Sequence, residues 1–215
     1  MTEVSQEINA VRRRVGHRVL EAGQARSMTI SRVYPAGIEA LWDMCTNPAR
    51  LQRWFLPVSG ELRAGGRFQI EGNAGGEIER CDPPAGFAAT WEYGGQQSWI
   101  EVRLAELDGG TRFELEHVVP VDERWAEFGP GAVGIGWDLT VRGLSRYLAG
   151  GAGDEPADPL AHGRWMASAE GREFVALSGR GWCDADIAAG ADEAGARATA
   201  ERTTAFYTPP PPPAS

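Results

Sequence analysis

Histidine is the residue type in this sequence best suited to acid or base chemistry, and the chain contains His17, His117 and His162. No two of them stand at a metal-ligand spacing such as HxxxH, so we predict no metal site. His117 alternates with Phe113 and Leu115 in a stretch typical of a strand, which turns its imidazole toward the same covered face. There it could move a proton or orient a ligand, or it could simply be hydrogen-bonded near a strand end. His117 is therefore a candidate catalytic residue beside that plainer interpretation.

Signals for covalent or nucleotide chemistry are weak. No GxSxG motif occurs, and the sequence assigns no base to Cys45 or Cys81, so covalent catalysis is not predicted. Residues 129–134 satisfy the phosphate-binding pattern GxGxxG, but no parallel β-α-β unit surrounds them. We expect these glycines to let the chain bend over a cavity mouth, with Trp125 and Phe128 covering it. No cofactor is predicted.

Aromatic side chains are the strongest remaining signal, because the chain contains eight tryptophans. Trp91 and Tyr93 share the inward parity of one expected strand, and Trp137 lies on the inward face of an expected helix. Aromatic residues around an apolar space are typical of a small-molecule site, although they also fit a filled core. The predicted ligand-binding residues are Trp91, Tyr93, Phe113, His117, Trp137 and Val141.

The elements that must position these residues follow from periodicity and turn residues. Residues 27–34 are rich in strand formers, and short helices are expected over 38–45 and 48–54. Between residues 58 and 119, short alternating segments separated by glycine and proline turns predict an antiparallel meander. We expect about six or seven strands, with one covered and one solvated face. A long helix must cover the sheet, with its buried stripe formed by Val133, Trp137, Val141, Leu144 and Leu148.

The two ends of the chain lie outside this pattern. Val4, Ile8, Val11, Val15 and Val19 are spaced by three and four, which predicts an amphipathic N-terminal helix packed on this protein or on a second copy. Residues 150–159 have the composition of a linker. Beyond it, helices are expected over 169–189 and 192–207, with large apolar residues that pack back on the domain or on a second copy. The prolines of residues 209–213 predict a disordered tail.

Composition limits the partners. The 215 residues are 42% hydrophobic and 24% charged, which is typical of a globular protein with one principal domain. Acidic residues exceed basic ones by 30 − 21 = 9, so nucleic acid is not an expected partner. No apolar run reaches the roughly 20 residues of a membrane span, and no signal peptide is expected. Three widely spaced cysteines fit a reducing cytoplasm.

The order of strand, two short helices, meander and long helix resembles the helix-grip fold of the SRPBCC (START-like) superfamily. Short motifs in matching order resemble its branch related to the activator of Hsp90 ATPase. They are Pro35-Ala36-Gly37-Ile38-Glu39-Ala40-Leu41-Trp42, Thr46-Asn47-Pro48, Leu51, Trp54, Gly65-Gly66 before Phe68, Pro84 before the Trp91 strand, Gly110-Thr111 before Phe113-Leu115-His117, and Gly136-Trp137 leading to Leu144. The chain lacks the NxNNWHW element and separate N-terminal domain of the true activators, so their activity is not implied.

The resemblance implies an α+β fold in which a curved antiparallel sheet grips a long C-terminal helix, often around a cavity for a hydrophobic ligand. The expected organisation is a helical extension at 1–26, the family domain at 27–149, a linker at 150–160, a helical extension at 161–208 and the tail at 209–215. The leading hypothesis is a cytoplasmic carrier or sensor of a small hydrophobic, aromatic or lipid-like molecule. A polyketide cyclase or dehydratase using His117 or Tyr93, and a co-chaperone-like interaction module with a protein partner or homodimer, remain alternatives.

Overall fold

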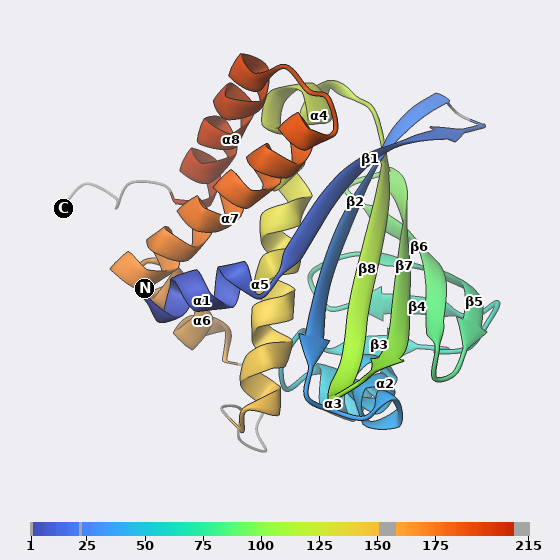
Figure 1. Cartoon of the computed structure of the whole chain (residues 1–215). Helices are drawn as coiled ribbons and strands as arrows, with labels where there is room; N and C mark the ends of the chain where they lie inside the picture. Colours follow the sequence, from blue (N-terminus) through green and yellow to red (C-terminus); the bar gives the residue numbers. More distant parts are fainter. Residues whose placement is uncertain (1, 22, 151–157, 209–215) are drawn as a thin grey trace, which may run out of the picture.

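The computed structural model describes residues 2–21, 23–150 and 158–208. In this part of the chain, eight strands form one antiparallel sheet in the order β1-β2-β8-β7-β6-β5-β4-β3 (Figure 1). The strands are β1 (Arg12–Leu20), β2 (Gly23–Tyr34), β3 (Val58–Gly60), β4 (Arg67–Ile70), β5 (Gly75–Asp82), β6 (Gly86–Tyr93), β7 (Gln96–Leu107) and β8 (Gly110–Pro120). The helices are α1 (Glu3–Asn9), α2 (Ile38–Thr46), α3 (Pro48–Leu51), α4 (Glu123–Phe128), α5 (Gly131–Leu148), α6 (Pro159–Met166), α7 (Ala169–Ala188) and α8 (Glu193–Tyr207).

The predicted meander is confirmed, and tight turns join its longest strands. β7 and β8 pair from Leu107 opposite Gly110, so two residues make the connection. Gly109, the second residue of this connection, occupies the left-handed region at φ 85°, which glycine adopts at little cost. On the outer face, Arg103 forms ion pairs with carboxylates that include Glu114. The alternation of apolar and charged residues therefore produces one covered and one solvated face, as predicted.

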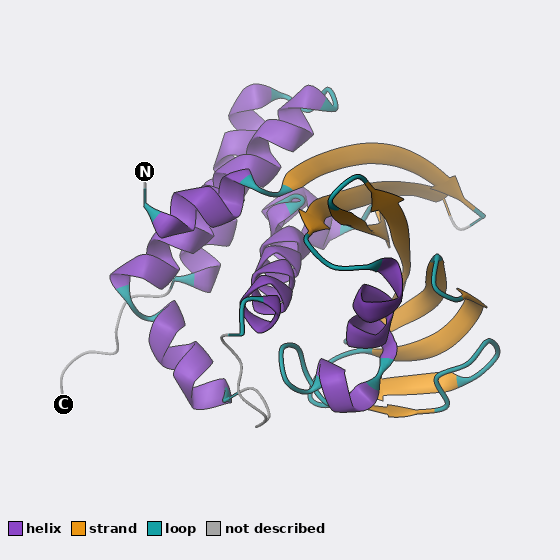
Figure 2. Cartoon of the chain, turned by 60° about the horizontal axis from the view of Figure 1, so that its bottom comes forward, coloured by secondary structure: helices purple, strands orange, loops and turns teal. Residues whose placement is uncertain are grey.

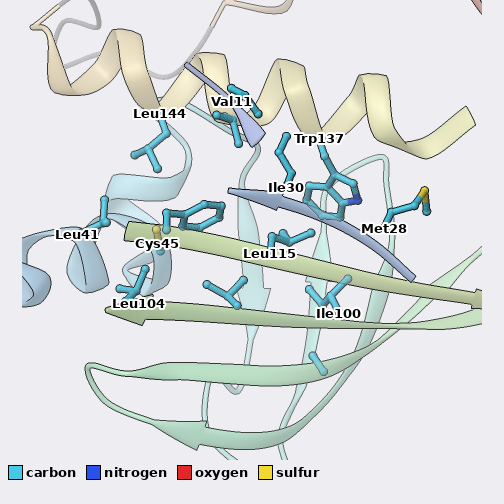
Figure 3. Close-up of a cluster of buried hydrophobic side chains, with 14 of the residues drawn as sticks. Val11, Met28, Ile30, Leu41, Cys45, Ile100, Leu104, Leu115, Trp137 and Leu144 are labelled. Atoms are coloured by element: carbon cyan, nitrogen blue, oxygen red, sulfur yellow. The ribbon is translucent and has the colours of Figure 1, made fainter. Parts of the chain in front are cut away.

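The long helix α5 covers the concave face of the sheet, as predicted from its apolar stripe. Figure 2 shows the curved sheet on one side of α5 and further helices on the other. Trp137, Val141 and Leu144 are all less than a tenth exposed. Figure 3 shows Trp137 pointing from α5 toward the sheet and Leu144 pointing toward the helix that carries Leu41. Burial of this stripe provides most of the driving force that holds helix and sheet together.

The helices α2 and α3 connect β2 to β3 along the chain and cover one end of the sheet (Figure 1). Asn47 separates them, because its side chain accepts a hydrogen bond from the backbone N–H of Ala49 and so starts α3 with Pro48 in its first turn. The ring of Trp42 on α2 meets Phe87 of β6 edge to face, with centroids 6.3 Å apart. These two short helices therefore form a third wall, facing the sheet beside α5.

A second layer of helices packs against α5 on the side away from the sheet (Figure 1). The predicted helices at 169–189 and 192–207 are confirmed as α7 and α8, and α7 packs directly on α5. Phe174 and Trp182 of α7 are each 1% exposed. A Cβ at Gly134 of α5 would lie 2.3 Å from the Trp182 ring, so the contact requires glycine there. The C-terminal helices therefore pack on this domain, and α6, which the sequence did not predict, joins them.

The prediction of one helix from Val4 to Val19 is wrong for its second half. Helix α1 ends at Asn9, and residues 12–20 form β1, the edge strand paired with β2. Val19 is 86% exposed at the end of this strand rather than buried. The strand predicted over 27–34 begins earlier, at Gly23. With β1 added, the described sheet has eight strands rather than the expected six or seven. Most of the predicted linker and the proline-rich tail at 209–215 lie outside the described residues.

Candidate functional site

A cavity of about 310 Å³ lies between the sheet, helices α2 and α3, and helix α5. Its lining is largely aliphatic and aromatic, and the lining residues extend along the chain from Trp42 to Thr140. The lining residues are Trp42, Cys45, Thr46, Leu51, Trp54, Phe55, Val58, Leu62, Phe68, Ile70, Ile78, Cys81, Pro83, Phe87, Ala89, Trp91, Ile100, Val102, Phe113, Leu115, Trp137 and Thr140. A concave, mostly apolar space of this size suits a small molecule.

Two tryptophan rings form the wall where sheet and long helix meet. Trp91 of β6 and Trp137 of α5 have ring centroids 5.2 Å apart and are tilted by 57°. Phe68 of β4 extends this wall, with its centroid 6.4 Å from that of Trp91. Large rings with few rotatable bonds lose little entropy when a flat ligand packs against them.

A family model described as activator of Hsp90 ATPase homolog 1-like protein matches residues 35–149, more than half of the chain. The chain belongs to this family. The matched residues span α2 to the end of α5, so they include all the elements that line the cavity. The α+β helix-grip fold predicted from the sequence is therefore confirmed, with helices added at both ends.

Solved structures show the same family relationship along most of the chain. The crystal structure of CalU16 from Micromonospora echinospora is 32% identical, covers 85% of this chain and 99% of its own, and has a TM-score of 0.64. Its solution NMR structure gives 34% identity, coverage of 84% and 97%, and a TM-score of 0.67. PFC0360w, an HSP90 activator from Plasmodium falciparum, is 20% identical over 58% of this chain and 97% of its own, with a TM-score of 0.50, and shares the fold alone. A comparison with curated proteins gave no match.

Three of the predicted site residues line the cavity of this family member, namely Trp91, Phe113 and Trp137. The expectation that Tyr93 faces Trp137 is wrong, because Tyr93 is the last residue of β6 and is 55% exposed. Val141 is 2% exposed on α5, and its carbonyl accepts a hydrogen bond from the Tyr34 hydroxyl at 3.0 Å. Val141 therefore belongs to the packed core beside the cavity.

His117 lies behind the tryptophan wall and holds it in place. Its Nδ1 accepts a hydrogen bond from Trp137 Nε1–H at 3.0 Å, which leaves the ring proton on Nε2. Nε2–H then donates to Ser98 Oγ at 2.8 Å, and that hydroxyl donates to the carbonyl of Trp91 at 3.0 Å. Burial lowers the pKa of His117 to about 3, so the ring is neutral. The geometry favours a positioning role over acid or base chemistry.

We expect His117 to make the protein less stable in mild acid. An unfolded histidine titrates near pH 6.5, whereas the native ring titrates near 3. Between these values the unfolded state binds a proton that the native state does not, so the free energy of unfolding falls as the pH is lowered. From pH 7 to 5 this contribution is about 2 kcal/mol. Urea denaturation at both pH values should show a smaller loss in His117→Gln, and equal losses in the two proteins would contradict the buried neutral ring.

The glycine-rich stretch at 129–134 serves helix packing. Gly129 ends α4 at φ 60°, and Gly134 lets the Trp182 ring approach α5. The expectation that Trp125 and Phe128 cover the cavity is wrong, because both lie on α4, which packs on α8 and α5. Partly exposed lining residues include instead Trp54, Phe55, Val58, Leu62 and Pro83.

Four polar or thiol-bearing residues of the cavity were not among the predicted site residues. Thr46 and Thr140, which carry hydroxyls, and Cys45 and Cys81, which carry thiols, are among the lining residues. Burial raises the pKa of the Cys45 thiol to about 12, so it is not a thiolate. Thr140 follows Trp137 by three residues on a helix, and this spacing alone places both on one face. Among the described residues, no three His, Cys, Asp or Glu side chains lie close enough to hold a metal ion.

Proposed function

We propose that this protein binds a small, largely apolar molecule with aromatic character in the cavity between sheet and helix, as a carrier or sensor. The observation that carries the proposal is the cavity of about 310 Å³ with its paired tryptophan wall. Apolar lining atoms give water few partners, whereas a ring of matching shape recovers dispersion contacts with them. Membership of a helix-grip family adds support from fold alone. In the described part of the chain, no helix is long and apolar enough to cross a membrane.

The cyclase or dehydratase alternative has less support. Among the described residues that line the cavity there is no carboxylate, histidine or arginine to serve as acid or base. Of the two residues considered for that role, His117 has both ring nitrogens engaged and Tyr93 is exposed at a strand end. A candidate acid or base must come within hydrogen-bond reach of the substrate. Ligand binding therefore explains more of the geometry than catalysis.

The interaction-module alternative also loses part of its basis. Such a module would use the N-terminal helix and the C-terminal extension to bind its partner. Val4 of α1 is 2% exposed, and Phe174 and Trp182 of α7 are 1% exposed, because these elements pack on one another and on α5. These three large residues are therefore covered within the chain, whereas Leu160 and Phe206 of the C-terminal extension remain exposed.

Filling the cavity should weaken binding at least tenfold without unfolding the protein. Ala89 lines the cavity and is 1% exposed, so Ala89→Leu places extra methyl groups in the space that a ligand would occupy. We expect at least a tenfold loss of affinity for the neutral probe N-phenyl-1-naphthylamine, measured by fluorescence titration. The free energy of unfolding should fall by less than the roughly 1–3 kcal/mol that overpacking a filled core costs.

Ala88→Leu is the matched control, because it adds the same group to the same strand on the opposite face. Its affinity for the probe should equal that of the wild type. Absence of saturable probe binding in the wild type would overturn the proposed function. Equal binding by all three proteins would place the probe outside the cavity and would also overturn it.

A further inference from the structure

The cavity is largely apolar but has a few polar residues in its lining, and the hydrogen-bond donors of four of them are already engaged within the protein. Its lining includes Thr46 and Thr140, which each carry a hydroxyl, and Trp54 and Trp137, which each carry an indole N–H. From their hydrogen bonds we infer that the cavity selects an uncharged molecule that carries a hydroxyl or other hydrogen-bond donor on an aromatic framework. This inference rests on the proposed function and narrows it to a ligand class.

Both threonines have their donors already engaged. Thr46 Oγ1–H donates to the carbonyl of Trp42 at 2.8 Å, and Thr140 Oγ1–H donates to the carbonyl of Gly136 at 2.9 Å. Each bond reaches back one turn along its own helix, a common geometry for threonine inside a helix. A hydroxyl has one donor and two acceptor lone pairs, so each oxygen retains acceptor capacity. The threonines thus offer acceptors to a ligand.

The indole groups have likewise used their N–H donors within the protein. Trp137 Nε1–H donates to His117 Nδ1, and Trp54 Nε1–H donates to the carbonyl of Met44, both at 3.0 Å. These rings therefore offer their faces and edges but no N–H to a ligand. A ligand whose polar group only accepts hydrogen bonds gains nothing from these four residues, whereas a ligand that donates finds two oxygens.

The absence of charged side chains among the described lining residues selects against ionised ligands. The lining contains no cationic side chain among the described residues, so a bound carboxylate would lose its hydration without an opposite charge. On α5, the carboxylate of Asp138 is one residue from Trp137 but pairs with Arg13, and both side chains are buried away from the cavity. Arg13 is thereby unable to serve a ligand anion. Fatty acids and aromatic carboxylates are therefore disfavoured.

The threonine on α5 is placed to act together with the tryptophan wall. Thr140 lies three residues after Trp137, so the two side chains project from the same face of the helix. A planar ring packed against Trp137 presents its edge substituents along this face. A hydroxyl at that edge can donate to Thr140 Oγ1. We therefore expect this bond to hold the aromatic ring in one orientation.

A matched series of naphthalene, 2-naphthol, 2-methoxynaphthalene and 2-naphthoate tests the inference at pH 7. The first three are uncharged, the naphthol alone donates a hydrogen bond, and the naphthoate is ionised. Affinities measured by displacement of N-phenyl-1-naphthylamine should favour the naphthol about fivefold over its methyl ether, as one net hydrogen bond predicts. The naphthoate should bind at least tenfold more weakly than the naphthol.

The double variant Thr46→Val/Thr140→Val preserves shape but removes both acceptors. It should bring the naphthol down to the affinity of its methyl ether and leave naphthalene unchanged, which also shows that the cavity remains intact. If naphthalene displaces the probe but the naphthol has no advantage, or keeps it in the double variant, the inference is overturned and the proposed function stands. If the naphthoate binds as tightly as the naphthol, the inference is likewise overturned. If naphthalene displaces nothing, the proposed function itself fails.

Discussion

Leu144→Asp is expected to leave the protein unfolded at room temperature. Leu144 is 1% exposed and points from α5 toward α2, where Leu41 is fully buried (Figure 3). Truncating a buried leucine costs about 2–5 kcal/mol, and an ionised carboxylate in its place adds the loss of its hydration. The sum approaches or exceeds the roughly 5–15 kcal/mol that stabilises a typical domain. Circular dichroism and a thermal scan should show no cooperative transition.

Arg146→Asp provides the control, because it introduces the same carboxylate on the solvent side of the same helix. We expect it to cost at most about 1 kcal/mol, since an acidic group in the last turn of a helix opposes the helix dipole. A Leu144→Asp protein that melted like the wild type would contradict the view that α5 is the principal cover of the sheet.

The sequence predicted most of the sheet because its strands carry a pattern that only a strand satisfies. Ile100, Val102 and Leu104 alternate with polar residues at a spacing of two, and a helix would scatter them around its axis. The same argument failed around β1, where Val11, the residue just before the strand, and Val15 are four residues apart. Four is close to one helical turn and is also twice the strand period, so the spacing alone cannot separate the two structures.

The candidate site was predicted as far as parity reaches. The alternation of side chains along a strand correctly placed Trp91 and Phe113 on the covered face. It does not show how far along the strand that face is covered, and Tyr93, at the end of β6, is exposed. The cavity walls from α2, α3 and the segment after them depend on packing between distant segments, as do the roles of Thr46 and Thr140. Charges could not be paired either, because the partners of a buried ion pair can be separated by most of a domain.

Asp138 is the clearest case, and it carries the second large effect that we expect. Its carboxylate is fully buried and accepts hydrogen bonds from Arg13 Nη2 at 2.7 Å and Nε at 2.9 Å, from Ser178 Oγ at 2.5 Å and from Trp182 Nε1 at 2.9 Å. One side chain thus connects the edge strand β1, the long helix α5 and helix α7. Neither the N-terminal strand nor the C-terminal helices can keep these bonds without it.

Asp138→Ala should destabilise the protein by about 3–5 kcal/mol, because it leaves the Arg13 guanidinium buried without its counter-ion. Ser178 and Trp182 lose their acceptor in the same step, which adds unsatisfied donors in the interior. Urea denaturation measures the loss directly. Hydrogen exchange should show it first in β1 and α7, the two elements that the carboxylate connects to α5.

A double variant separates the effect of the broken pair from that of the lost side chain. Arg13→Met/Asp138→Leu replaces both charges by apolar groups of similar size, so no buried ion remains. We expect it to be more stable than Asp138→Ala and within about 2 kcal/mol of the wild type, because the cost lies mainly in the unpaired guanidinium. If the double variant is as unstable as Asp138→Ala, the bonds to Ser178 and Trp182 carry the stability instead. If Asp138→Ala loses less than about 1 kcal/mol, the carboxylate does not hold the three elements together, and packing at Gly134 and Trp182 must suffice.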